Sequence, residues 1–365
     1  MTLQLGIVGL PNTGKSTLYN ALTRAGAAVA PYPFTTIDPN VGVAVIRDPR
    51  LTALADIVQP ERLIPATIEI VDIAGLVRGA HRGEGLGNQF LGHIRNVDAV
   101  LIVARCFDDP DTPHPYGRID PLEDMEILEL ELALADLGTI ERRLEKSRAA
   151  AKANPREFAA ELHALENIKD VLQQGTPAID WATSHDRLDL VGQWGLLTTK
   201  PRLLVANVSE RDLPGGGPSA ELVEKHAAAR HTESIVICAQ TEMDLADWPP
   251  DEANLYLQEL GVVSRGLDQV TAAGYRLLGL ITFFTITGGH EVRAWPIPRG
   301  TPAPAAAGRV HTDMERGFVR AEVLPLNDLL SAGSWVSARE SGRVRVEGRS
   351  YLVQDGDVIH FRFAV

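Results

Sequence analysis

Residues 9–17 read GLPNTGKST and constrain the fold of this chain more than any other segment. They fit the pattern G-x-x-x-x-G-K-[ST] and lie between an apolar strand pattern over residues 3–8 and a helical pattern over residues 17–23. In such a loop the backbone N–H groups and the helix N-terminus turn toward a phosphate group. The order of strand, glycine-rich loop and helix therefore predicts a phosphate-binding turn in a parallel α/β sheet, with a chance glycine-rich turn as the alternative.

The side chains of this loop suggest separate roles. We expect Lys15 to lie between the β- and γ-phosphates of a nucleotide, as a catalytic cation, and the hydroxyl group of Ser16 to bind Mg²⁺. Asn12 could stabilise the turn or bind a K⁺ ion that supplies positive charge beside the phosphates. The other loop residues that we expect to contact the nucleotide are Thr13, Gly14 and Thr17.

A second phosphate-sensing motif follows the third expected strand, at residues 67–71. Asp72 and Gly75 form a D-x-x-G pattern there. Asp72 would hold Mg²⁺ through water, and the N–H group of Gly75 would contact the γ-phosphate and so take part in catalysis. Between the two motifs, Thr36 is the residue that we expect to bind Mg²⁺ and sense the γ-phosphate, with Thr35 as the alternative. A D-x-x-G turn is common, but its place after the phosphate loop makes the pair of motifs specific.

Short apolar strand patterns alternate with helical patterns and predict a parallel, doubly wound sheet. The expected strands cover residues 3–8, 42–46, 67–71, 99–104, 202–206 and 234–238. We expect a nucleotide-binding domain formed by residues 1–119 and 200–280. An antiparallel helical hairpin is expected over residues 120–199, because Asp-Pro and Asn-Pro start signals precede two leucine-rich helical stripes.

The last part of the chain, residues 281–365, is expected to form a small α+β module. Its strand patterns are short, and residues 280–365 contain ten arginines, no lysine and nine acidic residues. The whole chain has a net charge of −13, which excludes a uniformly basic protein that coats nucleic acid but not a local basic patch. Basic residues near the tip of the hairpin and the arginines of the module are either a solvated surface or a contact with RNA.

The segment after the fifth expected strand is where a base would be recognised. Asn207, Val208 and Glu210 form N-x-x-E, whereas a guanine-specific protein would have N-K-x-D, with the aspartate accepting from the base. A longer carboxylate and a missing lysine disfavour strict guanine choice, and the Asn207 amide can pair with an adenine edge, unless it only caps a turn. Cys238 and Ala239 end the sixth strand, where we expect a backbone contact to the base.

The usual water-orienting glutamine after D-x-x-G is replaced by Leu76, which cannot orient water. His114 lies in a loop after the fourth expected strand, at the sheet edge where ligands gather, and is our candidate for this catalytic role. A solvated loop histidine is the alternative, as is a group supplied by a partner.

The cysteines and apolar runs bear on the compartment. Cys106 and Cys238 are the two cysteines and show no metal or disulfide spacing, which fits a reducing compartment. The longest apolar runs, such as residues 97–107, are too short to span a bilayer. We therefore expect a cytoplasmic protein without a membrane partner, and a monomer.

The chain resembles the Obg-like ATPase (YchF) family along essentially its whole length. The resemblance lies in GLPNTGKSTLYNALT, YPFTTIDPNVGV, VDIAGLVRGAHRGEGLGNQFL, ANVSE, AGRVHTDMERGF and DGDVIHFRF. It implies a Ras-like P-loop domain with a helical insertion and a C-terminal, ubiquitin-like TGS domain. It also implies ATP hydrolysis with ATP preferred over GTP, and association with the ribosome. The alternatives are a nucleotide-gated ribosome or RNA adaptor with little turnover and a conventional GTPase.

Overall fold

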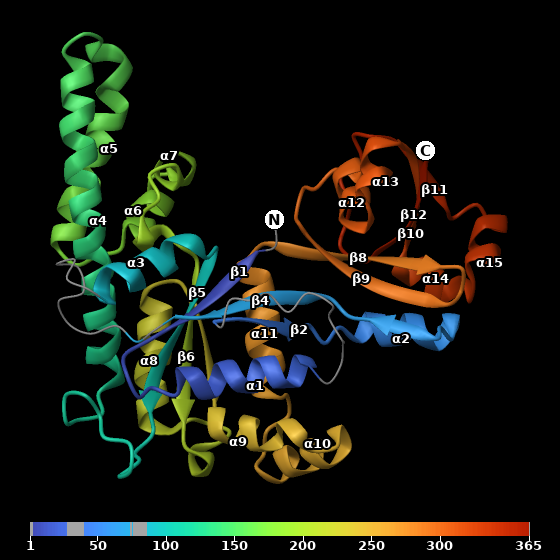
Figure 1. Cartoon of the computed structure of the whole chain (residues 1–365), viewed down its shortest axis with the longest axis horizontal. Coiled ribbons are helices and arrows are strands. Elements are labelled where there is room, and N and C mark those ends of the chain that lie inside the picture. The colour runs from blue at the N-terminus through green and yellow to red at the C-terminus, as the bar shows by residue number, and fades with distance from the viewer. Residues whose placement is uncertain (1–2, 28–39, 74, 76–85, 365) are drawn as a thin grey trace. The chain divides into compact units, whose positions relative to one another are not determined.

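The computed structural model describes residues 3–27, 40–73, 75 and 86–364 (Figure 1). The chain divides into two compact units, each built from separate stretches of sequence. Unit 1 contains Met1–Leu22, Thr36–Gly42 and Glu69–Val270, and unit 2 contains Thr23–Thr35, Val43–Ile68 and Thr271–Val365. Within the described ranges, no helix combines the length and the apolar character needed to cross a bilayer.

The sheet of unit 1 has the strand order β2-β4-β1-β5-β6-β7. Its strands are β1 (Gln4–Val8), β2 (Val41–Val45), β4 (Thr67–Asp72), β5 (Ala99–Cys106), β6 (Arg202–Val208) and β7 (Glu233–Ile237). The β1 strand pairs in parallel with both β4 and β5, and β6 continues the parallel order to β7. Every residue of β5 is buried, as expected for a parallel strand covered on both faces. The six predicted strands and the doubly wound α/β fold are confirmed. The sheet is not parallel throughout, because the Asp72 N–H group donates to the Asn40 carbonyl and the Ile46 N–H group to the Ala66 carbonyl, which sets β2 antiparallel to β4.

Further helices, apart from those of residues 120–199, lie wholly or partly within unit 1. They are α1 (Lys15–Ala27), α3 (Leu86–Asn96), α8 (Gly217–Ala229), α9 (Ala239–Asp244), α10 (Pro250–Glu259) and α11 (Gly266–Leu277). Apolar side chains of α3 and α8, such as Ile94 and Val223, pack on the sheet face that carries Ile102 and Leu204. Strand order changes direction at β1, so the carboxyl ends of β1 and β5 frame a crevice in which α/β proteins bind ligands.

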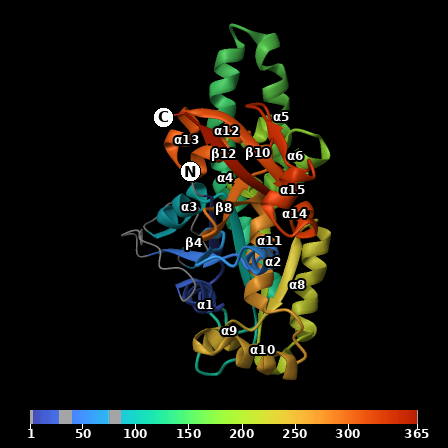
Figure 2. The ribbon, with the colours of Figure 1, turned by 90° about the vertical axis from the view of Figure 1, so that its right-hand side faces the viewer.

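The predicted helical hairpin is present as α4 (Pro121–Ala151) and α5 (Pro155–Gln173), which lie side by side in Figures 1 and 2. Asp120 caps α4 by accepting a hydrogen bond from the N–H group of Glu123 at 3.1 Å. The second half of α4 packs on α5 through residues such as Ile140 and Leu165. The first half of α4 packs on the sheet instead, which leaves Leu130 of the predicted stripe 47% exposed. Short helices α6 (Ala178–Ser184), α7 (Leu188–Gly192) and η2 (Leu197–Thr199) lead back to β6.

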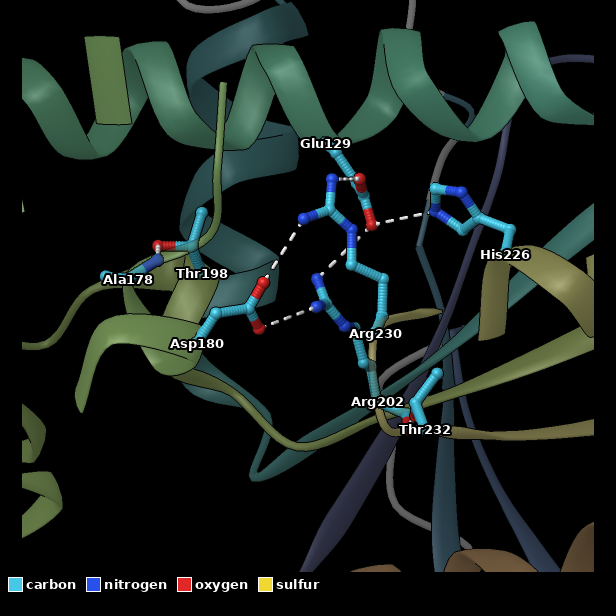
Figure 3. A network of polar contacts seen from close by, with 8 residues as sticks. All are labelled: Glu129, Ala178, Asp180, Thr198, Arg202, His226, Arg230 and Thr232. Carbon is cyan, nitrogen blue, oxygen red and sulfur yellow. Dashed lines mark hydrogen bonds and ion pairs between the residues drawn. The ribbon is translucent and has the colours of Figure 1, made fainter. Parts of the chain in front are cut away.

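A partly buried ionic network joins the base of the hairpin to the sheet (Figure 3). Glu129 of α4 lies 3.3 Å from Arg230, 3.4 Å from Arg202 and 3.3 Å from His226, and its side chain is only 5% exposed. Asp180 of α6 pairs with the same two arginines at 3.2 and 3.5 Å. Burial opposes ionisation of Glu129, but the hydrogen bond from His226 and the two guanidinium charges outweigh it and lower its pKa. The network therefore fixes the base of the hairpin on β6 and α8.

Unit 2 contains a second sheet with the order β11-β10-β12-β8-β9-β3. Its strands are β3 (Arg62–Ile64), β8 (Leu280–Thr287), β9 (Glu291–Pro298), β10 (Phe318–Pro325), β11 (Arg345–Glu347) and β12 (Asp357–Phe363). Its helices are α2 (Pro49–Val58), α12 (Ala303–Val310), α13 (Thr312–Arg316), α14 (Leu326–Ala332) and α15 (Trp335–Glu340). Phe283, Ile359 and the alanines of α12 form its core. Residues 351–353, whose short apolar pattern is typical of a strand, form only an isolated bridge between Leu352 and Pro302.

Residues 43–68 are the main difference from the expected organisation, which placed them with the nucleotide domain. In the structure β3 pairs in parallel with β9, and the Arg50 guanidinium of α2 lies 2.8 Å from Asp355. Arg50 and Asp355 are separated by 305 residues in the sequence. A local pattern cannot reveal such a partner, because helix and strand signals describe only neighbouring residues.

Candidate functional site

The phosphate loop leaves the carboxyl end of β1 in a conformation that its sequence allows. Asn12 and Gly14 have left-handed backbones, with φ of 64° and 86°. A Cβ atom on Gly14 would overlap the Asn207 side-chain nitrogen, so glycine is required there for two reasons. Thr13 is fully buried, and its hydroxyl group donates to the Leu10 carbonyl at 3.1 Å. Thr13 therefore shapes the loop from inside rather than facing a ligand through its side chain.

Lys15 and Gly75 come together, as the two motifs predict. The Lys15 ammonium group donates to the Leu10 carbonyl at 2.7 Å, and the residue is 7% exposed. A Cβ atom on Gly75 would lie 3.2 Å from Lys15 Nζ and 3.1 Å from the backbone nitrogen of Pro11. Burial lowers the pKa of Lys15 to about 8 despite the opposing charge of Asp72. The D-x-x-G turn thus lies against a buried amine whose protonation is opposed by burial.

The two described Mg²⁺ candidates also meet. Ser16 Oγ donates to Asp72 Oδ2 at 3.2 Å, and Ser16 is exposed. Burial raises the pKa of Asp72, against the effects of Ser16 and Lys15. A hydroxyl oxygen and a carboxylate oxygen at this distance suit a hard cation that keeps waters and phosphate oxygens as its other ligands, as Mg²⁺ does. Thr36, the third candidate, and its alternative Thr35 lie outside the described residues.

The phosphate loop opens onto a cleft of about 580 Å³ in unit 1, and Lys15 and Ser16 are among the residues that line it. Among the described residues that the sequence predicts to contact the nucleotide directly, Thr13 and Gly75 do not line this cleft. The predicted residues that line it are Asn12, Gly14, Lys15, Ser16, Thr17, Asn207, Val208, Glu210, Cys238 and Ala239. Sequence reasoning missed Phe107, Asp109, Thr112, Ser209, Gln240, Thr241 and Asp244. Most of them follow the carboxyl ends of β5, β6 and β7, so the rule that ligands bind at these ends could have found them.

Asn207 holds the wall of the cleft together. Its Nδ2 atom donates to the Thr13 carbonyl at 2.9 Å, and its Oδ1 atom accepts from the Ala239 N–H group at 2.9 Å. The residue is 4% exposed. The predicted pairing of this amide with an adenine edge therefore competes with two structural hydrogen bonds, which favours the alternative that Asn207 supports the turn.

The carboxylate of the N-x-x-E segment is engaged as well. Thr241 Oγ1 donates to Glu210 Oε2 at 2.9 Å. A hydrogen bond with the same carboxylate raises the pKa of Tyr256. Glu210 thus lines the cleft with its side chain tied to α9 and α10.

Arg105 is a buried cation that sequence reasoning did not single out. It is 1% exposed and lies within β5, where its guanidinium donates to three carbonyl groups. The acceptors are Asn12 at 3.2 Å, Phe107 at 3.2 Å and Asp109 at 3.4 Å. Its Cζ atom lies 4.5 Å from the centre of the Phe107 ring. Arg105 therefore joins the phosphate loop to the loop after β5, and a charged residue inside an apolar strand run is the signal that could have revealed it.

His114 does not line the cleft. Its Nε2 atom lies 2.9 Å from Asp124 Oδ2 of α4, and its side chain is 4% exposed. Its Nδ1 atom accepts from the Tyr116 N–H group at 3.2 Å. The adjacent Pro113 carbonyl accepts from Asn12 Nδ2 at 3.0 Å, so the side chain considered for K⁺ ties this loop to the phosphate loop. The catalytic role of His114 stays a prediction, and this geometry gives it no support.

Comparison with known proteins places this site in a family. Residues 4–149 match the family model described as "50S ribosome-binding GTPase", and residues 280–364 match the YchF-GTPase_C model, described as "Protein of unknown function". The "Ribosome-binding ATPase YchF" of Bacillus subtilis is 47% identical, and that of Escherichia coli O157:H7 is 44% identical, each over all of both chains. The structure of the Schizosaccharomyces pombe YchF GTPase is 34% identical, with a TM-score of 0.88 over 99% of this chain and 98% of that one. Because its fold matches that of a YchF structure and its sequence matches YchF proteins over the full length, the chain belongs to the YchF family.

Proposed function

We propose that the protein is a Mg²⁺-dependent ATPase that binds ATP in the cleft of unit 1 and acts in the cytoplasm as a ribosome-associated switch. The observation that carries this proposal is the meeting of Lys15 with Gly75 and of Ser16 with Asp72 beside one cleft. A buried ammonium group, a backbone N–H group and two oxygen ligands are the parts that phosphoryl transfer from a nucleoside triphosphate requires.

Each residue has a distinct task in this proposal. Lys15, held by the Leu10 carbonyl, would bind between the β- and γ-phosphates, whose charge would restore its protonated state. Ser16 and Asp72 would hold Mg²⁺, which, when bound, would neutralise charge on the phosphates. Gly75 would donate its N–H group to the γ-phosphate. A Cβ atom at this position would lie 3.2 Å from Lys15 Nζ, which is closer than an ordinary van der Waals contact.

ATP is the proposed substrate because the groups that would read guanine are already engaged. A guanine base would need the Glu210 carboxylate, which accepts a hydrogen bond from Thr241 at 2.9 Å. Losing a charge-assisted contact of this kind costs on the order of 1.5–3 kcal/mol, or about one to two decades of GTP affinity. The ring of Phe107 lines the same cleft and offers a surface on which any base can stack.

Association with the ribosome rests on the relatives, two of which are named ribosome-binding ATPases. Slow hydrolysis without a partner would follow from the position of His114, since its ring nitrogens are engaged away from the cleft. This observation favours a second candidate function, a nucleotide-gated ribosome adaptor with little turnover of its own.

Single-turnover hydrolysis of ATP and GTP, with and without purified ribosomes, tests these proposals. We expect ATP cleavage that depends on Mg²⁺, is slow alone and is faster with ribosomes. Calorimetry should give ATP affinity at least equal to GTP affinity; GTP binding tenfold tighter would identify a conventional GTPase. Cleavage that ribosomes do not accelerate, together with nucleotide-dependent ribosome binding, would favour the adaptor.

A further inference from the structure

One face of the unit 2 sheet carries two arginines directly opposite each other. In the antiparallel pairing of β10 with β12, Arg320 lies opposite Arg362, and Glu322 lies opposite His360. Residues two apart on a strand point to the same side of a sheet, so these four side chains share one face. Like charges placed directly opposite each other destabilise a sheet unless a counter-charge lies beside them.

The counter-charge is a single buried carboxylate. The Glu322 side chain is 5% exposed and lies 3.0 Å from Arg362 Nη2 and 3.7 Å from Arg320 Nη2. Arg362 also donates through Nε at 3.2 Å, and its hydrogen bond lowers the pKa of Glu322. Arg339 of α15 adds its charge to the same carboxylate. Three guanidinium groups thus surround one acid, which leaves an excess of about two positive charges.

These charges remain open to solvent. The side chains of Arg320 and Arg362 are 52% and 51% exposed, and Arg339 is exposed. Trp335 stands one helical turn before Arg339 and packs on His360 with ring centres 4.5 Å apart, which brings α15 to this side of the sheet. We refer to Arg320, Arg339, Arg362 and Trp335 as the arginine face.

We propose that the arginine face binds phosphate groups of ribosomal RNA, an inference that rests on the proposed ribosome association. The guanidinium is planar and matches phosphate oxygens with paired N–H donors. Glu322 accepts hydrogen bonds from Nε and Nη2 of Arg362 and so orients its guanidinium group. The remaining N–H groups of Arg362 stay available for an outside acceptor. In a chain with a net charge of −13, a fixed cluster of exposed arginines is where a polyanion can approach.

The test compares two double variants of the full-length protein. Arg320→Gln with Arg362→Gln removes two charges from the arginine face. Arg309→Gln with Arg316→Gln removes two exposed charges from α12 and α13, whose side chains pack on the opposite sheet face. Binding is measured at several salt concentrations to purified bacterial ribosomes and to a single-stranded oligouridylate, and ATP affinity and thermal unfolding are measured in parallel.

We expect the arginine-face variant to bind both probes at least about tenfold more weakly at low salt, which corresponds to about 1.4 kcal/mol. The slope of log affinity against log salt for oligouridylate should fall by about 1.4, since each lost single-strand contact removes about 0.7. The control variant and the ATP affinity should be unchanged. If the double variant unfolds, Arg339→Gln, which leaves the Arg362–Glu322 hydrogen bonds in place, should still weaken both probes about threefold.

Three outcomes separate this inference from the proposed function. Equal ribosome binding by both double variants would overturn the arginine face and leave the ribosome association intact. Weaker ribosome binding without any loss on oligouridylate would overturn RNA as the partner and indicate an acidic protein segment. A wild-type protein that binds no ribosomes in any nucleotide state would reject the proposed association, whereas an oligouridylate loss confined to the arginine-face variant would still support an RNA-binding face.

Discussion

Ser16 Oγ donates a hydrogen bond to Asp72 Oδ2 at 3.2 Å, although 56 residues separate them. Ser16 is the second residue of α1, and Asp72 is the last residue of β4. The parallel pairing of β1 with β4 brings the N-terminus of α1 and the carboxyl end of β4 together. The phosphate loop and the D-x-x-G turn are therefore parts of one site.

The affinity for ATP should fall as the pH rises above 8. Burial lowers the pKa of Lys15 to about 8, so the free protein loses the proton that ATP requires as the pH passes this value. With one proton taken up on binding, affinity should be about tenfold lower at pH 9 than at pH 7. Calorimetry in buffers with different ionisation enthalpies would measure the proton uptake. Lys15→Ala should bind ATP weakly at every pH; unchanged ATP affinity in this variant would reject the site.

Gly14→Ala should destabilise unit 1, because φ is 86° and the new Cβ atom would overlap the Asn207 side chain. We expect the free energy of unfolding to fall by about 1–3 kcal/mol, as is typical for a strained left-handed residue. Gly92→Ala is the matched control, since nothing lies within 4 Å of its added Cβ atom in helix α3. The control should be neutral or stabilising by up to about 1 kcal/mol. Denaturant unfolding of both variants checks this, and equal effects would contradict it.

Asn207→Ala should weaken ATP and GTP binding by the same factor. The change leaves the Thr13 carbonyl and the Ala239 N–H group without their side-chain partner, which loosens the phosphate loop for either nucleotide. The free energy of unfolding should fall by about 2 kcal/mol, the cost of unsatisfied buried groups. A loss confined to ATP, measured by competition binding, would instead identify Asn207 as a reader of the adenine edge.

The ion pair between Arg50 and Asp355 should make the stability of unit 2 depend on acid pH. Despite burial, the hydrogen bonds from Arg50 and the Thr282 N–H group lower the pKa of Asp355 below its ordinary value of 3.8. Because the pKa of Asp355 is lower in the folded state than in the unfolded state, its ionised carboxylate stabilises the fold at pH values above the unfolded-state pKa. This stabilisation is lost as the pH falls through the folded-state pKa.

Asp355→Asn keeps an acceptor for the Thr282 N–H group but removes the charge, and should cost about 1 kcal/mol at pH 7 and nothing at pH 2. Glu61→Gln is the control, because Glu61 and its partner His290 are both more than 70% exposed. Thermal unfolding of both variants at pH 7 and pH 2 measures these effects. If Asp355→Asn loses as much stability at pH 2 as at pH 7, the charge is not responsible.

Patterns between neighbouring residues predicted much of this protein. The phosphate loop, the six strands of the unit 1 sheet and the start of α4 at Asp120 are each encoded by a contiguous segment. Local steric and hydrogen-bonding preferences act over a few residues, so a single sequence contains them. The same reasoning placed Lys15, Ser16 and the carboxyl ends of β6 and β7 around one cleft.

Contacts between distant residues required the tertiary structure. Arg105 and its partner Asn12 are 93 residues apart in the sequence. Asn207 and Thr13 are 194 residues apart, and Arg50 and Asp355 are 305 residues apart. These contacts favour Asn207 as a support of the loop over its expected role as a base reader, and they place β3 and α2 with unit 2. The sequence by itself determined the local elements and the phosphate-binding chemistry, whereas the burial and pairing of each polar group depended on which segments packed together.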